Sequence, residues 1–248
     1  MIIGKNIKIA ALAAFILGCL TFISLGTIIV KSGGIVRPAE YPNPQGFTQA
    51  IYYFEMVADE AELAAALGDP ATEQGRAIRA SMDITNRIDF FFMTCYTSFL
   101  ASLVVLLFLL VRGAYPRAAK ALLAAGLVFS AATLLGDVME TRLLLRLTGP
   151  GGAAAAIAHL NCWARVKFGG IAAAGIVLSV FYLLHFGRTW QGVLFAVLFF
   201  GSSAVGLAAV SVFGLRHLIE VSANAGGAAW MAGLAHAGIM AFRRPAAP

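Results

Sequence analysis

The feature that most constrains the fold is a series of long stretches without a charged residue. Residues 9–30 and 90–111 each give 22 such positions, and residues 189–215 give 27. A helix needs about 20 apolar residues to cross the hydrocarbon core of a bilayer, which is about 30 Å thick. Only 12% of the chain is charged, whereas soluble domains carry about 25%. The sequence therefore predicts an all-α, polytopic transmembrane helix bundle.

Five spans are predicted, at residues 9–30, 84–111, 118–147, 154–186 and 190–221. Residues 223–242 are uncharged but rich in glycine and alanine, so they form either a sixth span anchored by Arg243 and Arg244 or a helix in the interface. The first stretch is longer than the apolar core of a signal peptide, about 7–15 residues, and is interpreted as an uncleaved helix. Since no internal repeat is visible, residues 1–248 are treated as one membrane domain.

The largest polar region lies between the first two predicted spans, at residues 31–83. Over residues 47–67, apolar side chains recur at helical spacing while acids gather at Glu55, Asp59, Glu60 and Glu62. This pattern predicts an amphipathic helix, and a second short helix is expected over 72–83. About 50 residues build a poor core alone. We therefore expect an extramembrane helical insertion that lies on the bilayer surface or covers the bundle as a lid.

The charges divide unevenly between the two ends of the predicted bundle, here called the basic face and the acidic face. If residues 223–242 span the membrane, the acidic face holds all 12 acids together with 10 of the 18 Lys and Arg residues. Several of those cations lie within helices, and loop cations mark the cytoplasmic side. We therefore predict an integral protein of the cell or inner membrane, with its N-terminus cytoplasmic and residues 31–83 extracytoplasmic. The basic face carries these residues and no acid: Lys5, Lys8, Arg112, Arg117, Lys120, Arg188, Arg243 and Arg244.

Ionisable residues recur at similar depth near the acidic face. Charges at membrane depth are costly, usually face the bundle interior and mark functional sites. Helical spacing places Asp137 and Glu140 on a stripe of small residues, and it places His217 and Glu220 on a similar stripe along 190–221; such stripes let helices pack closely. The arginines at 142 and 146 face elsewhere, toward the headgroup boundary. The predicted ligand-binding residues are Asp89, Tyr96, Asp137, Glu140, Arg165, His217 and Glu220.

Two other interpretations of these residues stay open at this stage. Paired charges could instead fix the register of the helices, since buried charges survive by pairing. A metal site is the weaker alternative, because paired-metal bundles use Glu-x-x-His motifs and no such motif occurs among the i, i+3 pairs. No metal ligand, cofactor or catalytic residue is assigned. The pairs considered are Asp137 with Glu140, His159 with Cys162, and His217 with Glu220.

The preferred function is a polar, charged pocket that binds an amphiphile or a polar headgroup in the extracytoplasmic half of the bundle. One alternative is a membrane enzyme, with or without a metal, that acts on a lipid-like substrate through Asp137, Glu140 or His217. Another is an accessory subunit with a membrane-protein partner. The sequence lacks a phosphate-binding glycine-rich loop, a Gly-x-Ser-x-Gly motif and a His-Glu-x-x-His motif. Its short basic turns suit anionic lipid headgroups, so the bilayer and not nucleic acid is the expected partner.

Overall fold

The computed structural model describes residues 4–32, 46–149 and 155–243, and within these ranges the chain is helical without a β-strand. Residues 33–45 and 150–154, which carry most of the predicted loop and of the TGPGG breaker, and Arg244 lie outside the described residues. The long helices are α1 (Lys5–Ser32), α4 (Glu73–Val111), α5 (Pro116–Thr148), α6 (Ala155–Phe186), α7 (Trp190–Ser211) and α8 (Leu218–Phe242). The short ones are α2 (Ala50–Glu55), α3 (Glu60–Leu67) and the 3-10 turn η1 (Phe213–Leu215).

Within the described ranges, six helices are long and apolar enough to cross a membrane. They are α1, α4, α5, α6, α7 and α8. The sequence allowed either a sixth span or an interfacial helix at residues 223–242, and the structure places these residues in α8, which is long enough to span. The prediction of an all-α polytopic bundle is confirmed. The protein is an integral membrane protein.

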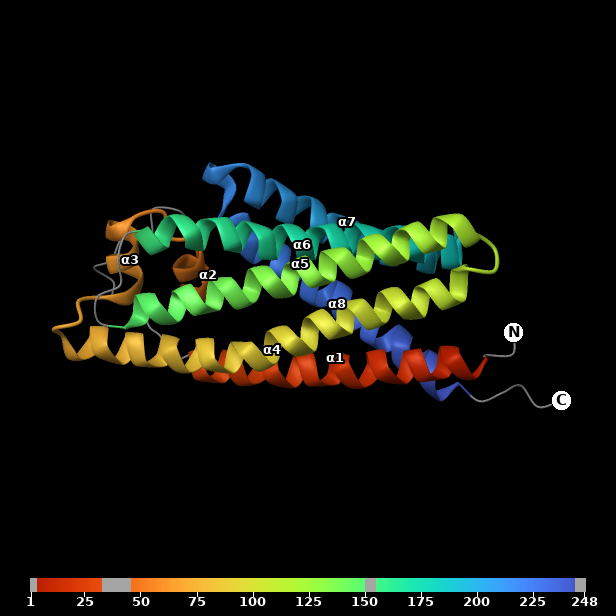
Figure 1. Ribbon diagram of the computed structural model, residues 1–248, viewed down its shortest axis with the longest axis horizontal. Helices are drawn as coiled ribbons and strands as arrows, with labels where there is room; N and C mark the ends of the chain where they lie inside the picture. Colours follow the sequence, from red (N-terminus) through yellow and green to blue (C-terminus); the bar gives the residue numbers. More distant parts are fainter. Residues whose placement is uncertain (1–3, 33–45, 150–154, 244–248) are drawn as a thin grey trace.

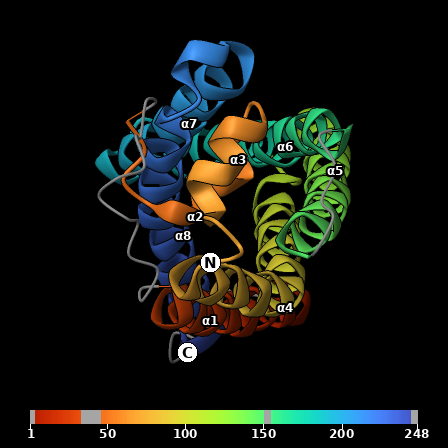
Figure 2. The same cartoon turned by 90° about the vertical axis from the view of Figure 1, so that its left-hand side faces the viewer.

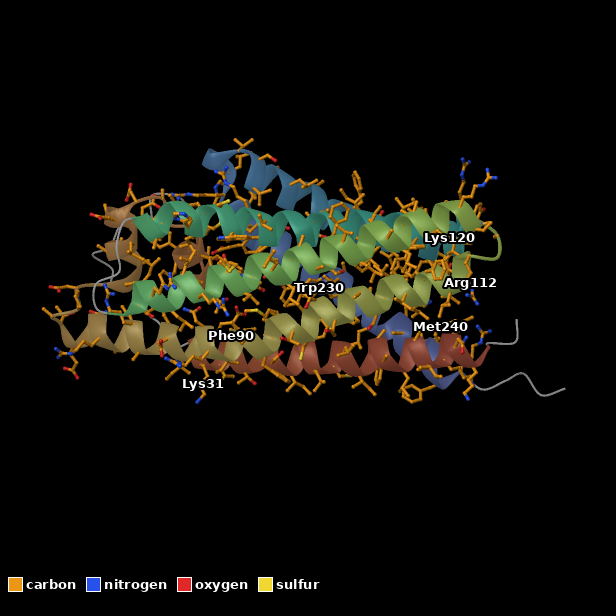
Figure 3. All side chains as sticks on the ribbon, in the orientation of Figure 1. Lys31, Phe90, Arg112, Lys120, Trp230 and Met240 are labelled. Atoms are coloured by element: carbon orange, nitrogen blue, oxygen red, sulfur yellow. The ribbon has the colours of Figure 1, made fainter. Side chains whose placement is uncertain are left out.

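The spanning helices form a closed ring. Each packs against its neighbour in the chain, from α1 and α4 through α5, α6 and α7 to α8, and α8 returns to α1. Figure 1 shows α1 beginning and α8 ending at one end of the bundle. In Figure 3, Arg112 and Lys120 lie at that same end, Lys31 lies toward the other, and Trp230 lies between. The two ends of the helix bundle are therefore the basic face and the acidic face inferred from the sequence.

The short helices α2 and α3 lie inside the ring at its acidic face (Figure 2). We call residues 46–67 the plug. Most of its large apolar side chains are buried, Phe54 and Leu67 completely, and they share a core with Leu144 of α5 and Leu160 of α6. The plug is two helices and not the single helix predicted. The reason is Asp59, whose Oδ1 accepts a hydrogen bond from Glu62 N at 2.9 Å and caps a new helix there.

Two predicted helix boundaries are wrong. The expected helix over 190–221 ends at Ser211, because the chain turns inward and places Arg216 in the interior, where its guanidinium donates to Met56 O at 2.6 Å. His217 and Glu220 consequently do not lie on α7. The separate short helix expected over 72–83 is the first part of α4. Thr72 starts α4 as its N-cap, accepting from Gly75 N at 3.0 Å, and no breaker follows before Val111.

Helices α5 and α6 approach closely because glycines lie between them. A β-carbon on Gly136 would lie 2.6 Å from Lys167 N, and one on Gly170 would lie 2.4 Å from Thr133 Oγ1. Adjacent Gly169 points elsewhere, and a β-carbon there would meet nothing within 4 Å. The contact between α5 and α6 thus depends on particular glycines.

Gly170→Val should destabilise the protein, whereas Gly169→Val should change its stability little. Both variants place a β-branched residue in the same helix, but only the first forces α5 away from α6. Overpacking of this kind costs about 1–3 kcal/mol. Thermal unfolding of both variants in one detergent measures the difference. Equal shifts would show that the glycine contact does not control packing.

Candidate functional site

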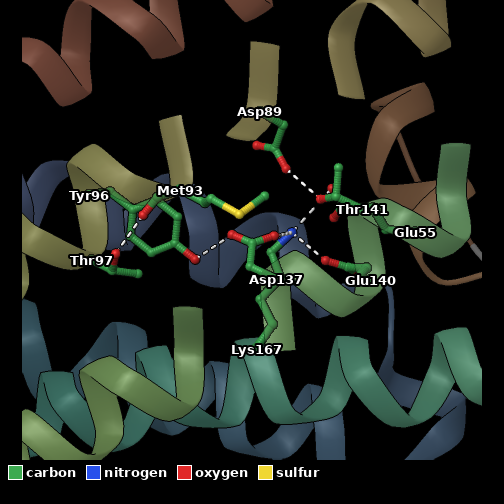
Figure 4. Close-up of polar contacts among 9 residues, drawn as sticks. All are labelled: Glu55, Asp89, Met93, Tyr96, Thr97, Asp137, Glu140, Thr141 and Lys167. Atoms are coloured by element: carbon green, nitrogen blue, oxygen red, sulfur yellow. Dashed lines mark hydrogen bonds and ion pairs between the residues drawn. The ribbon is translucent and has the colours of Figure 1, made fainter. Parts of the chain in front are cut away.

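An ion cluster lies inside the acidic-face half of the bundle, around Lys167 of α6 (Figure 4). Lys167 Nζ is 2.6 Å from Glu140 Oε2, 3.0 Å from Asp137 Oδ1 and 3.3 Å from Glu55 Oε1. Asp137 and Glu140 are fully buried, and Glu55 and Lys167 nearly so. The cluster therefore joins α5, α6 and the plug through groups that water scarcely reaches.

Two hydroxyl groups extend this cluster toward α4. Tyr96 OH donates a hydrogen bond to Asp137 Oδ2 at 2.6 Å, and Thr141 Oγ1 donates to Asp89 Oδ2 at 2.9 Å. The Tyr96 ring also stacks on Trp230 of α8, with centroids 5.3 Å apart. We call Glu55, Asp89, Asp137, Glu140 and Lys167 the carboxylate–lysine cluster.

The local sequence of α5 explains how these groups come together. Residues three and four apart share a face of a helix, so Asp137, Glu140 and Thr141 all point inward from a single turn. Gly136, immediately before Asp137, lets the α6 backbone approach at Lys167, since a β-carbon would collide with Lys167 N. The sequence GDVMET thus supplies two of the acids, Asp137 and Glu140, the hydroxyl of Thr141, and the glycine that lets α6 approach α5.

Among the described residues, the carboxylate–lysine cluster sets four carboxyl groups against a single ammonium group. An ionised group buried without a partner costs several kcal/mol. Burial raises the pKa of the Glu55 carboxyl, and the neighbouring Lys167 ammonium lowers it in part. Negative charge in the cluster thus exceeds what Lys167 can balance, unless protons or a further cation compensate it.

A cavity of about 160 Å³ adjoins the cluster. Glu55, Asp89 and Lys167 supply the charged part of its lining, here called the polar end, and the remaining walls are largely apolar. Ile29, in the α1 wall, is 58% exposed, so this part of the cavity wall is also on the outer surface of the bundle. The remaining wall includes Leu25 and Ile28 of α1, Tyr52 of α2, Phe92 and Tyr96 of α4, and Gly226, Gly227 and Trp230 of α8.

Four of the seven predicted ligand-binding residues meet around Lys167. Asp137 and Glu140 contact it directly, Tyr96 binds Asp137, and Asp89 is linked to the same α5 turn through Thr141. Of these four, Asp89 and Tyr96 also line the cavity.

The other three predicted residues lie elsewhere. Arg165 is exposed on α6, because two residues of α-helix place it about 200° from Lys167. His217 lies half-buried in the turn before α8. Glu220 is buried and binds the start of the plug: its carboxylate accepts from Gln49 N and Thr48 Oγ1, each at 2.6 Å. Glu220 thus holds the plug and does not line the cavity.

Sequence reasoning missed Glu55 and Lys167 as site residues. Glu55 was assigned to the solvent side of an amphipathic helix, but the plug turns it inward. Lys167 could have been found, because it continues a stripe of small residues along α6. Ala164, Gly170 and Ala174 stand three, three and seven positions from it, and all are buried.

No group of three or more His, Cys, Asp or Glu side chains that could hold a metal ion occurs in the described part of the chain. No protein family, curated protein or solved structure matches this chain.

Lys167→Met should destabilise the protein strongly, whereas Arg165→Met on the exposed face of α6 should not. Removing one partner of a buried ion pair costs about 3–5 kcal/mol, and exposed substitutions cost within about 0.5 kcal/mol. The loss in Lys167→Met should be smaller at about pH 5 than at about pH 8, because protonation neutralises the abandoned carboxylates. Thermal unfolding at both pH values measures this. A pH-independent loss would contradict the proposed charge balance.

Proposed function

We propose that the protein binds an amphiphile, with the polar head at the carboxylate–lysine cluster and the apolar chain along α1 and α8. The observation that carries this proposal is the cavity itself, whose lining combines the charged residues Glu55, Asp89 and Lys167 with largely apolar walls. Ligand sites commonly combine apolar walls with a few placed polar groups.

The polar end of the cavity has unused hydrogen-bonding capacity. Glu55 Oε2, Thr85 Oγ1 and Asn86 Nδ2 are buried and have no hydrogen-bond partner among the described residues, and all three residues line the cavity. A buried polar atom without a partner costs about 1–3 kcal/mol. A polar head placed between α2 and α4 would supply partners to these atoms.

The apolar walls suit a hydrocarbon chain. Leu25 and Ile28 of α1, Phe92 of α4 and Trp230 of α8 all line the cavity. Gly226 and Gly227 on α8 leave room, since a β-carbon on either would meet nothing within 4 Å. The plug fills the acidic-face end of the ring, so we propose that the amphiphile arrives sideways from the lipid, at the exposed end of α1 near Ile29.

The distribution of charge supports an orientation in the cell membrane. The basic face, free of acids in the sequence, would be cytoplasmic by the positive-inside rule. The plug and the carboxylate–lysine cluster would then lie in the extracytoplasmic half. The amphiphile would come from the outer leaflet.

Gly227→Leu should abolish amphiphile binding without unfolding the protein, because its side chain would occupy the open cavity. Gly201→Leu on α7 is the matched control, since a β-carbon there also meets nothing within 4 Å and Gly201 does not line the cavity. The probes are decyl chains with trimethylammonium, sulfate and maltoside heads. A ligand that binds the folded state at about 100 times its Kd stabilises it by about 2.7 kcal/mol.

Thermal unfolding in dodecyl maltoside micelles gives the readout. At least one decyl probe should raise the unfolding temperature of the parent protein and of Gly201→Leu, but not that of Gly227→Leu. The proposed function is wrong if no probe stabilises the parent, or if Gly227→Leu responds like the parent.

A further inference from the structure

The charged groups around the cavity differ in what they still offer to a ligand. Three carboxylate oxygens already lie within 3.3 Å of Lys167 Nζ. An anion that approached this ammonium group would therefore also meet their negative charge. Glu55 is in the opposite position: its side chain is 8% exposed and lines the cavity, and Oε2 has no partner among the described residues.

We infer that the head group accepted by this cavity is an organic cation, an ammonium group that binds between Glu55 and Asp89. This inference rests on the proposed amphiphile-binding function and names its ligand class. The two carboxylates come from α2 and α4, and both line the same cavity. A cation between them would compensate charge that the single ammonium of the described cluster leaves unbalanced.

Aromatic rings supply a second, independent feature that favours a cation. Tyr52, Phe92, Tyr96 and Trp230 line the same cavity as the two carboxylates. Ring faces attract ammonium groups, and indole does so best. Tyr96 and Trp230 stack at 18°, which leaves the rings in a fixed arrangement. Carboxylates combined with aromatic rings are typical of sites that bind alkylated ammonium groups.

An anionic head would meet the opposite conditions. It would lie beside Glu55 and Asp89, and juxtaposed like charges are strongly unfavourable at desolvated sites. Besides Glu55, the cavity-lining residues with an unpaired buried polar atom in the described part of the chain are Thr85 and Asn86. Both are neutral and cannot balance a negative charge. The residues that line the cavity therefore favour a positively charged head group over a negatively charged one.

The test measures binding at the cavity itself through the fluorescence of Trp230, in a Trp163→Phe, Trp190→Phe background that keeps Trp230 as the single tryptophan. In dodecyl maltoside micelles, the protein is titrated with decyltrimethylammonium, decyl sulfate and decyl maltoside, which share one chain and differ in head charge. Tetramethylammonium shows whether the head alone binds. Lysophosphatidylethanolamine shows whether the ammonium can come from a lipid headgroup.

We expect decyltrimethylammonium to bind at least about ten times more tightly than decyl sulfate. Glu55→Gln should raise its Kd about tenfold, and so should Asp89→Asn, which serves if the first variant folds poorly. Glu60→Gln, an exposed acid of the same plug, is the matched control and should bind as the parent does. Additional binding of lysophosphatidylethanolamine would assign the cation to a lipid headgroup, and its absence would assign it to a free amine.

The possible failures are distinguishable. Equal or tighter binding of decyl sulfate, or unchanged affinity in both Glu55→Gln and Asp89→Asn, would overturn the cation inference while leaving amphiphile binding intact. If none of the decyl compounds changes Trp230 fluorescence or the unfolding temperature, the proposed function itself is wrong.

Discussion

The interior of this protein depends on the ion pairs that the Lys167 ammonium group forms with buried carboxylates. This ammonium group draws carboxylates from α5 and from the plug to within 3.3 Å, in a region where the surrounding side chains are apolar. Charges can be buried at this depth only when they are paired. The position of α5 against α6, the inward orientation of Glu55 and the location of the cavity's polar end all follow from this pairing, and Gly136 makes the approach possible.

The plug also needs partners for buried polar groups, which here belong to its backbone. Irregular backbone inside a membrane protein persists only where protein groups or water satisfy it. Between α2 and α3, Met56 O accepts from Arg216 Nη1 at 2.6 Å, and Val57 O accepts from Asn161 Nδ2 at 2.8 Å. Arg216 also pairs with Glu62. The break that divides the plug into two helices thus exposes carbonyl groups to side chains of the ring.

The sequence was sufficient for the class of fold but not for the path of residues 46–67. Uncharged stretches predict spanning helices, because each helix must itself be long and apolar enough to cross the bilayer. The spacing of Asp137 and Glu140 likewise predicts a local property, namely that both acids lie on the same face of one helix. The inward turn of Glu55 and the break before α8 depend on partners more than a hundred residues away, such as Lys167 and Met56. Periodicity contains no information about these partners.

The same locality explains why the helical spacing predicted Arg165 as a site residue and did not identify Lys167. Both are cations on one helix, and only the position of the neighbouring helices decides which face is interior. The stripe through Ala164 and Gly170 favours Lys167, whereas the stripe through Asn161 and Gly169 favours Arg165. Composition alone does not separate two stripes of similar size, but the glycine contact with Thr133 does.

The contacts of Glu220 with the start of the plug have a consequence for biogenesis. The groups that Glu220 holds lie 171 and 172 residues before it in the chain. At about 5–20 residues per second, the ribosome takes roughly 10–30 s to pass from one to the other. During that interval residues 46–67 have been made but Glu220 has not. The contacts that Glu220 makes with Thr48 and Gln49 can therefore form only after the α7–α8 turn has been synthesised.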